Sequence, residues 1–184
     1  MISLAHDPLF DEGAVISRVQ NLWMQLQAAH IDENMERLRP YFSSSLYQRE
    51  EAALRDAQRA GRIRQAVRPA ILNCSMSYEG EDRGHEKLAC RMLTRSRPFE
   101  TRKSTGTVVA GGQETFYREV WTLSRPAGAL TPKEGTAVTV HCPGCGGTMS
   151  LYKSAVCPFC GRLVPVPDFT WTVDDISRRT EPNP

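Results

Sequence analysis

The sequence has no large excess of either charge, no long apolar run and no segment typical of secretion. Its 184 residues include 23 Lys and Arg against 21 Asp and Glu, and the net charge of +2 neither favours nor excludes a polyanionic partner. No apolar run approaches the ~20 residues of a membrane-spanning helix, and the N-terminus lacks the basic region and apolar core of a signal peptide. We therefore expect a cytoplasmic protein with reduced cysteines, and peripheral contact with a membrane stays open.

Residues that could carry catalysis are also scarce. None of the four histidines has a carboxylate or a nucleophile at a sequence spacing typical of a catalytic pair. The pair Gly111-Gly112 lacks the pattern of a phosphate-binding loop. These absences argue against an enzyme.

What the sequence does contain is a pair of Cys-x-x-Cys motifs near its C-terminal end, formed by Cys142, Cys145, Cys157 and Cys160. Each motif is followed by a glycine, Gly146 or Gly161, which can adopt the left-handed backbone of a tight turn. Two such turns supply four thiolates at tetrahedral positions, with Zn–S distances of about 2.3 Å. The spacing predicts a zinc ribbon with one structural Zn per chain, because four thiolates leave no open coordination position.

Two other interpretations of these cysteines stay open. Rubredoxins have similar motifs, and sites of four sulfurs also accept iron. Two disulfides are the second alternative, but the sequence shows no sign of secretion. Between His141 and Pro167 the only full charges besides the thiolates are Lys153 and Arg162. Binding to nucleic acid needs clustered basic residues, so the ribbon favours a protein partner.

The N-terminal third has the pattern of helices. Asp11 is a typical N-cap, and Val15, Val19, Leu22 and Leu26 then recur at helical spacing. A short helix is expected from Asp32 to Pro40. A third helix is expected to begin at Ser43–Ser45 and to end at Gly61.

The region after Pro69 alternates with period two, which predicts strands. One strand is expected to place Leu72, Cys74, Met76 and Tyr78 on one face, and a second strand to carry Leu88, Cys90 and Met92. Arg95–Thr107 is polar, and Phe116–Arg125 is the clearest strand. Cys74 and Cys90 are interpreted as small buried apolar residues and not as a metal pair or a redox couple. Helices followed by antiparallel strands indicate the α+β class.

Two further groups of residues are candidates for binding. Tyr117, Glu119 and Trp121 share one strand face, and on a concave face they would place a carboxylate among aromatic rings in a pocket. The alternatives are an ion pair with an arginine or a carboxylate that faces water.

The second group is a basic cluster around the end of the third helix, consisting of Arg55, Arg59, Arg62, Arg64 and Arg68. Such a cluster could contact anionic lipid, at about 1 kcal/mol per charge near the surface. A solvated helix end, where positive charge suits the helix dipole, is the favoured interpretation.

The order of these elements resembles the Tim44-like domain family. The resemblance is carried by the helix containing Trp23, the segment Leu38–Ser43, the strand Phe116–Arg125 and the closing segment Trp171–Ile176. It implies a fold of the nuclear transport factor two-like superfamily, in which helices pack into the concave face of a curved antiparallel sheet. Bacterial relatives with a two-knuckle zinc ribbon before the last strand are the most similar.

The resemblance implies a non-catalytic adaptor or tether in protein transport or membrane-associated assembly, since the mitochondrial relatives bind acidic phospholipid and recruit a heat-shock chaperone. The alternative is a small-ligand binding protein or enzyme that uses a cone-shaped pocket with Glu119. We expect the α+β domain to cover residues 11–137 and 168–178, the ribbon 138–167, and flexible ends 1–10 and 179–184. If Phe169, Trp171 and Val173 form the final strand, the ribbon is an insertion between two strands.

Overall fold

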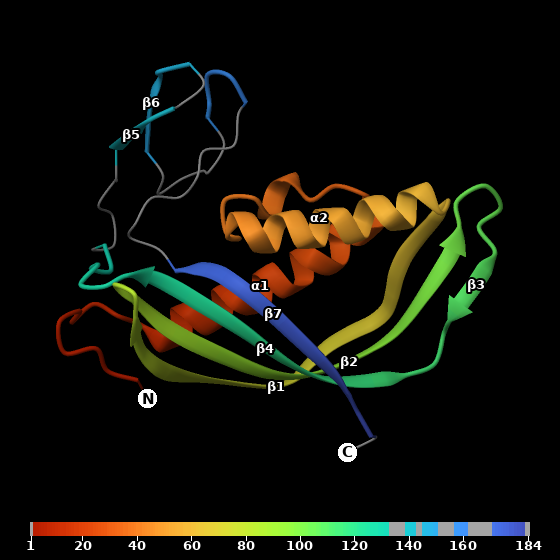
Figure 1. Cartoon of the computed structure of the whole chain (residues 1–184), viewed down its shortest axis with the longest axis horizontal. Helices are drawn as coiled ribbons and strands as arrows, with labels where there is room; N and C mark the ends of the chain where they lie inside the picture. Colours follow the sequence, from red (N-terminus) through yellow and green to blue (C-terminus); the bar gives the residue numbers. More distant parts are fainter. Residues whose placement is uncertain (1, 133–138, 143–144, 151–156, 162–170, 183–184) are drawn as a thin grey trace.

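The computed structural model describes residues 2–132, 139–142, 145–150, 157–161 and 171–182. Its helical elements are α1 (Glu12–Ile31), the 3-10 turn η1 (Glu36–Leu38) and α2 (Ser44–Arg59). Its strands are β1 (Arg62–Asp82), β2 (His85–Arg102), β3 (Val108–Gly111), β4 (Thr115–Pro126), β5 (Thr139–His141), β6 (Thr148–Ser150) and β7 (Thr172–Glu181). Figure 1 shows α1 and α2 on the same side of one strongly curved sheet, with β5 and β6 apart from it.

The helices begin where the sequence predicts. The Asp11 carboxylate accepts a hydrogen bond from the Ala14 N–H at 3.1 Å, and the Ser43 hydroxyl accepts one from the Leu46 N–H at 3.3 Å. The helix expected from Asp32 is only the single turn η1. Glu33 has a positive φ of 53°, so the backbone leaves the helical conformation directly after α1 and only one turn forms before Pro40.

The large sheet has the strand order β1-β2-β4-β7, and β3 pairs with β2 as a short additional strand. All of these pairs are antiparallel. The sheet is curved and unclosed, and the two helices pack against it (Figure 1), so the predicted α+β fold of the nuclear transport factor two-like kind is confirmed. β2 continues into the polar segment Arg95–Thr107 and ends at Arg102, because β1 and β3 both pair with it there.

The alternation expected in β1 was wrong for Leu72. A register shift between Ile71 and Asn73 turns Leu72 outward, where it is 46% exposed. Ile71, Cys74 and Met76 pack against the core instead. A bulge changes which residues share a face, and period-two reading along a single strand cannot detect it.

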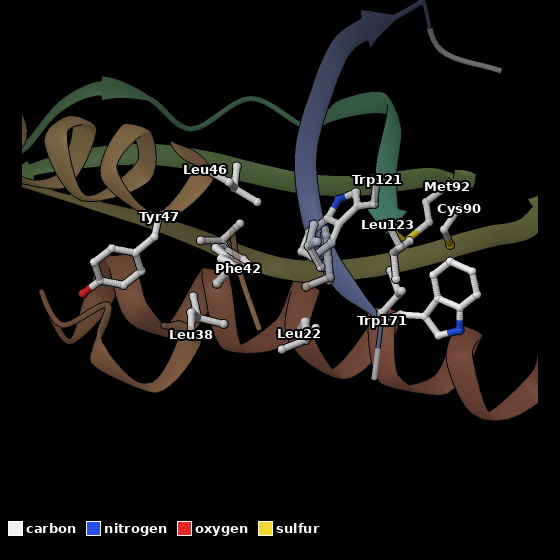
Figure 2. Packing of buried hydrophobic residues seen from close by; sticks show 14 of the residues in the cluster. Leu22, Leu38, Phe42, Leu46, Tyr47, Cys90, Met92, Trp121, Leu123 and Trp171 are labelled. Carbon is white, nitrogen blue, oxygen red and sulfur yellow. The ribbon is translucent and has the colours of Figure 1, made fainter. Parts of the chain in front are cut away.

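The core lies between α1, the loop before α2 and the concave face of the sheet. Figure 2 shows Phe42, Trp121 and Leu123 converging there, and the Phe42 and Trp121 rings meet edge to face with centroids 6.1 Å apart. The predicted strand face of Glu119, Trp121 and Leu123 is buried. A fully buried apolar side chain such as Leu123 contributes roughly 1.5–3 kcal/mol to stability.

β7 completes the sheet beside β4, in a register from Phe116 opposite Glu181 to Ser124 opposite Thr172. Since β5 and β6 lie between β4 and β7 in sequence, the ribbon is an insertion between two neighbouring strands. Val173 also exchanges backbone hydrogen bonds with Tyr41 and Ser43, at 2.8 and 2.9 Å. Phe169 lies outside the described residues.

Both ends of the domain differ from the expected flexible segments. Leu4 is buried in the core and Asp7 is 2% exposed. At the other end, Arg179–Glu181 belong to β7 and pair with β4. Among the described residues, no helix has the length and apolar character needed to cross a membrane.

Candidate functional site

The four cysteines of the predicted ribbon come together in space. Their Sγ atoms all lie within 4.8 Å of one another. The sulfurs of Cys142 and Cys160 are 3.7 Å apart, as are those of Cys145 and Cys157. A tetrahedral metal with metal–sulfur distances of about 2.3 Å has its sulfurs about 3.8 Å apart, so the spacing fits a four-thiolate metal centre.

The backbone of both motifs turns as the sequence predicts. Gly146 and Gly161 have φ values of 72° and 70°. Their N–H groups donate to the carbonyls of Cys142 and Cys157 at 2.8 and 2.9 Å. Each of these two equivalent turns directs two sulfurs toward the same point, so that all four sulfurs converge.

The electrostatics of the cluster also call for a cation. The Gly147 N–H lowers the pKa of Cys145. Burial and the neighbouring thiols of Cys160, Cys157 and Cys142 raise this pKa by more, so that its net value is about 12. Four thiolates this close repel one another, and a bound cation removes that repulsion by drawing their charge onto itself. The donor set of four sulfurs suits zinc or iron and leaves no position open for a substrate.

Glu119, the candidate pocket carboxylate, is fully paired. It is 1% exposed. It accepts hydrogen bonds from Trp23 Nε1 at 3.0 Å, Thr94 Oγ1 at 2.9 Å and Trp121 Nε1 at 3.3 Å. Arg178 Nη2 lies 3.0 Å from Glu119 Oε1. With both oxygens occupied, this carboxylate has the arrangement of a structural ion pair and not of a general base.

The partners of Glu119 could not be found from the sequence alone. Trp23 lies on α1 and Thr94 on β2, so both reach Glu119 only through the packing of distant segments. Arg178, on β7, also places its guanidinium 4.9 Å from the centroid of the Tyr117 ring. Tyr117, Glu119 and Trp121 are thus occupied in packing and in this buried network.

A cleft of about 460 Å³ opens beside this network and shares Arg178 with it. Its lining also includes His30, Arg64 and Phe99 but none of the three predicted pocket residues. The pKa of His30 is lowered to about 4, first by burial and then by the positive charges of Arg64 and Arg178. His30 is therefore neutral at neutral pH. Its Nδ1 is buried without a hydrogen-bond partner among the described residues.

The basic cluster predicted around the end of α2 is largely paired with carboxylates. Arg55 lies 3.1 Å from Glu51, and Arg59 pairs with Asp56. Arg62 and Arg64 share Glu100, at 3.0 and 3.3 Å; Arg68 is exposed on β1. This pairing offsets much of the positive charge that an anionic surface would meet.

A buried charge network that the sequence did not reveal centres on Arg125. Its side chain is fully buried, with Nη1 2.8 Å from Asp7 Oδ2 and Nε 2.7 Å from Glu86 Oε2. The Arg125 guanidinium lies 4.5 Å from the centroid of the Trp171 ring. Burial raises the pKa of Asp7, while hydrogen bonds from Thr131 and Arg125 lower it by more, so Asp7 stays ionised.

This network joins the two flanks of the ribbon. Thr131, on the N-terminal flank, donates to Asp7 through its N–H at 3.0 Å and its hydroxyl at 2.7 Å. Trp171, on the C-terminal flank, is buried against Arg125. We call these five residues, Asp7, Glu86, Arg125, Thr131 and Trp171, the Arg125 network. It fixes the positions from which the chain leaves and re-enters the body.

Comparison with known families agrees with this architecture. The family model of the Tim44-like domain matches residues 3–135. The chain belongs to the Tim44-like domain family. This family is linked to protein transport, its domains are generally non-catalytic, and its members interact with proteins or membranes. The match ends before β5, so the ribbon and β7 lie beyond it. Among curated proteins, none matches the sequence.

Proposed function

We propose that this Tim44-like protein is a non-catalytic adaptor that presents a zinc ribbon to a protein partner in protein transport or membrane-associated assembly. The observation that carries the proposal is the convergence of four thiols from two equivalent turns. The Arg125 network supports it, because Thr131 and Trp171, which flank the ribbon in sequence, are both attached to buried residues of the body. We place the protein in the cytoplasm, where metal-bound thiolates persist.

Zinc is the metal that the site favours. A structural role needs only a closed, redox-inert four-thiolate site, whereas electron transfer by iron would need more of the chain arranged around the metal. Elemental analysis of the purified protein should find about one Zn per chain. Visible absorption typical of iron–thiolate bonds, with iron in place of zinc, would contradict this assignment.

The ribbon's surface favours contact with a protein. Phe159 lies between the second pair of cysteines and is 69% exposed. Exposed aromatic side chains are typical anchor residues at protein interfaces. Few charges surround it in the sequence, so electrostatic binding to a polyanion is disfavoured.

Site-specific photocrosslinking tests this role. A photoreactive residue at Phe159 should capture a discrete protein partner in the native cell. The same photoreactive residue placed at Leu72, an exposed apolar position on β1 in the body, serves as the matched control. Equal capture at both positions, or capture of nucleic acid alone, would overturn the proposal.

The cleft beside His30 supports a second candidate, binding of a small ligand, since His30 Nδ1 is buried there without a partner among the described residues. This candidate uses His30, Arg64 and Arg178 in place of Glu119. Screening polar metabolites by thermal shift with wild type and His30→Gln distinguishes it from the adaptor role. A ligand that stabilises only the wild type would favour it.

A further inference from the structure

The two cysteines outside the ribbon meet across β1 and β2. The sulfurs of Cys74 and Cys90 are 3.2 Å apart. In the strand register Cys74 lies opposite Met92 and Cys90 opposite Met76, so the two cysteines are diagonal neighbours. A disulfide has an S–S distance of about 2.05 Å, so the two sulfurs stand about 1.1 Å farther apart than in a formed bond.

The two thiols differ in their access to solvent. Cys90 is fully buried on a central strand, where Figure 2 shows it beside Met92. Cys74 is half-buried and lies on β1, the edge strand of the described sheet. A small oxidant from solvent can therefore reach Cys74 first.

The pKa values of the two thiols also differ, and the difference favours Cys74 as the first to react. The hydrogen bond from Cys90 lowers the pKa of Cys74, burial raises it, and the Gln20 side chain lowers it again, so that the net pKa is lowered. Both the contact with Cys74 and burial raise the pKa of Cys90. Because the thiolate is the nucleophile, Cys74 is the attacking sulfur and Cys90 remains a thiol until it is needed.

We propose that Cys74 and Cys90 form a reversible oxidation site that reacts with a hydroperoxide. The Cys74 thiolate attacks the terminal oxygen of the hydroperoxide: an S–O bond forms, the O–O bond breaks, and the alkoxide leaves and takes up a proton as the alcohol. The Cys90 sulfur then attacks the sulfenic acid at Cys74, forming the S–S bond while the S–O bond breaks and water leaves. In total, two thiols and one hydroperoxide give a disulfide, an alcohol and water.

Packing alone is the competing explanation, since cysteine is a common small core residue. Two packed cysteines would react independently and slowly. An oxidation site requires that each cysteine depends on the other: Cys90 should be oxidised only through Cys74, and the sulfenic acid should persist only when Cys90 is absent.

The sequence provides a convenient assay. Trypsin cleaves after Arg64, Arg83, Lys87 and Arg91 but not at Arg68-Pro69, so Cys74 and Cys90 fall on separate peptides, Gln65–Arg83 and Leu88–Arg91. The zinc-loaded full-length protein is treated with tert-butyl hydroperoxide, alkylated and digested. We expect the two peptides to appear linked before zinc is released, and to separate after dithiothreitol.

Two matched variants complete the test. In Cys90→Ala, dimedone should trap a sulfenic acid at Cys74. In Cys74→Ala, oxidation of Cys90 should slow by about tenfold or more, because its thiol is buried and protonated. The proposal is overturned if the wild type never yields linked peptides while the ribbon cysteines oxidise. It is also overturned if Cys90 reacts at the same rate without Cys74.

Discussion

The body and the ribbon of this protein are stabilised by different means. The body buries a continuous apolar cluster that runs from Leu4 to Val173 and includes two tryptophans at 1% exposure or less, Trp23 and Trp121. In the described part of the ribbon, the buried cluster consists of Met149 and two cysteines of the candidate metal site, Cys142 and Cys157. We expect a small unit built around four thiols to depend on a bound metal for folding, whereas the body depends on packing. The two regions should therefore respond to different perturbations.

The largest expected effect is the unfolding of the ribbon while the body stays folded. Cys145→Ser, or removal of the metal with a chelator, should unfold the ribbon, because metal binding contributes about 10–16 kcal/mol to such units. Zinc content and limited proteolysis of residues 139–161 would report the loss, and the urea midpoint of the body should stay close to wild type. Phe159→Ala is the control that keeps all four thiols. Joint unfolding of both regions would show that the body also needs the metal.

The next effect concerns the network that links the regions. Arg125→Met should lower the free energy of unfolding by about 3–5 kcal/mol, because Asp7 and Glu86 would remain as buried charges without their partner. Urea denaturation measures the change. Adding Asp7→Asn and Glu86→Gln should restore part of the stability, since those changes remove the unpaired charges. If Arg125→Met alone were as stable as wild type, the network would have no role in holding the ribbon flanks.

A smaller effect is confined to the body and depends on pH. The pKa of His30 is about 4 in the folded protein and about 6.5 in the unfolded chain. The unfolded state therefore takes up the proton first, and the free energy of unfolding should fall by up to roughly 3 kcal/mol as the pH drops from about 6.5 to 4. Urea denaturation across this range should show a flatter profile in His30→Gln. An unchanged profile in that variant would mean that the pKa of His30 is nearly the same in the folded and unfolded states.

The smallest effect tests the start of α1. Asp11→Ala removes the side chain that accepts from the Ala14 N–H and should cost about 1 kcal/mol in the body. Thermal unfolding would detect this change, with the zinc content unaltered. Asp11→Ser keeps an N-cap acceptor and should recover most of the loss. A loss of several kcal/mol, or of zinc, would show that the segment before α1 has a larger role.

The parts of the molecule that sequence could predict are those governed by local chemistry. Asp11 and Ser43 as caps, the inward face of β4 and the turns at Gly146 and Gly161 follow from neighbours a few residues away. The convergence of the four cysteines was predictable because the chemistry of a tetrahedral thiolate site fixes their spacing.

The parts that were missed arise from contacts between distant segments. The outward turn of Leu72 depends on how β1 pairs with β2, and the extension of β2 depends on two partner strands. Asp7 and Arg125 are 118 positions apart, so their ion pair has no local signal. Arg178 likewise reaches Glu119 only after β7 has paired with β4.

The direct pairing of β4 with β7 makes the ribbon dispensable for the topology of the sheet. The backbone hydrogen bonds between these strands require nothing from the residues that connect them. We therefore expect the sheet to keep its topology when the connection is exchanged for another of similar end-to-end span, provided that Thr131 and Trp171 keep their contacts. The β4–β7 connection is thus a place where this fold can carry a separate small module without a change in the pairing of its sheet.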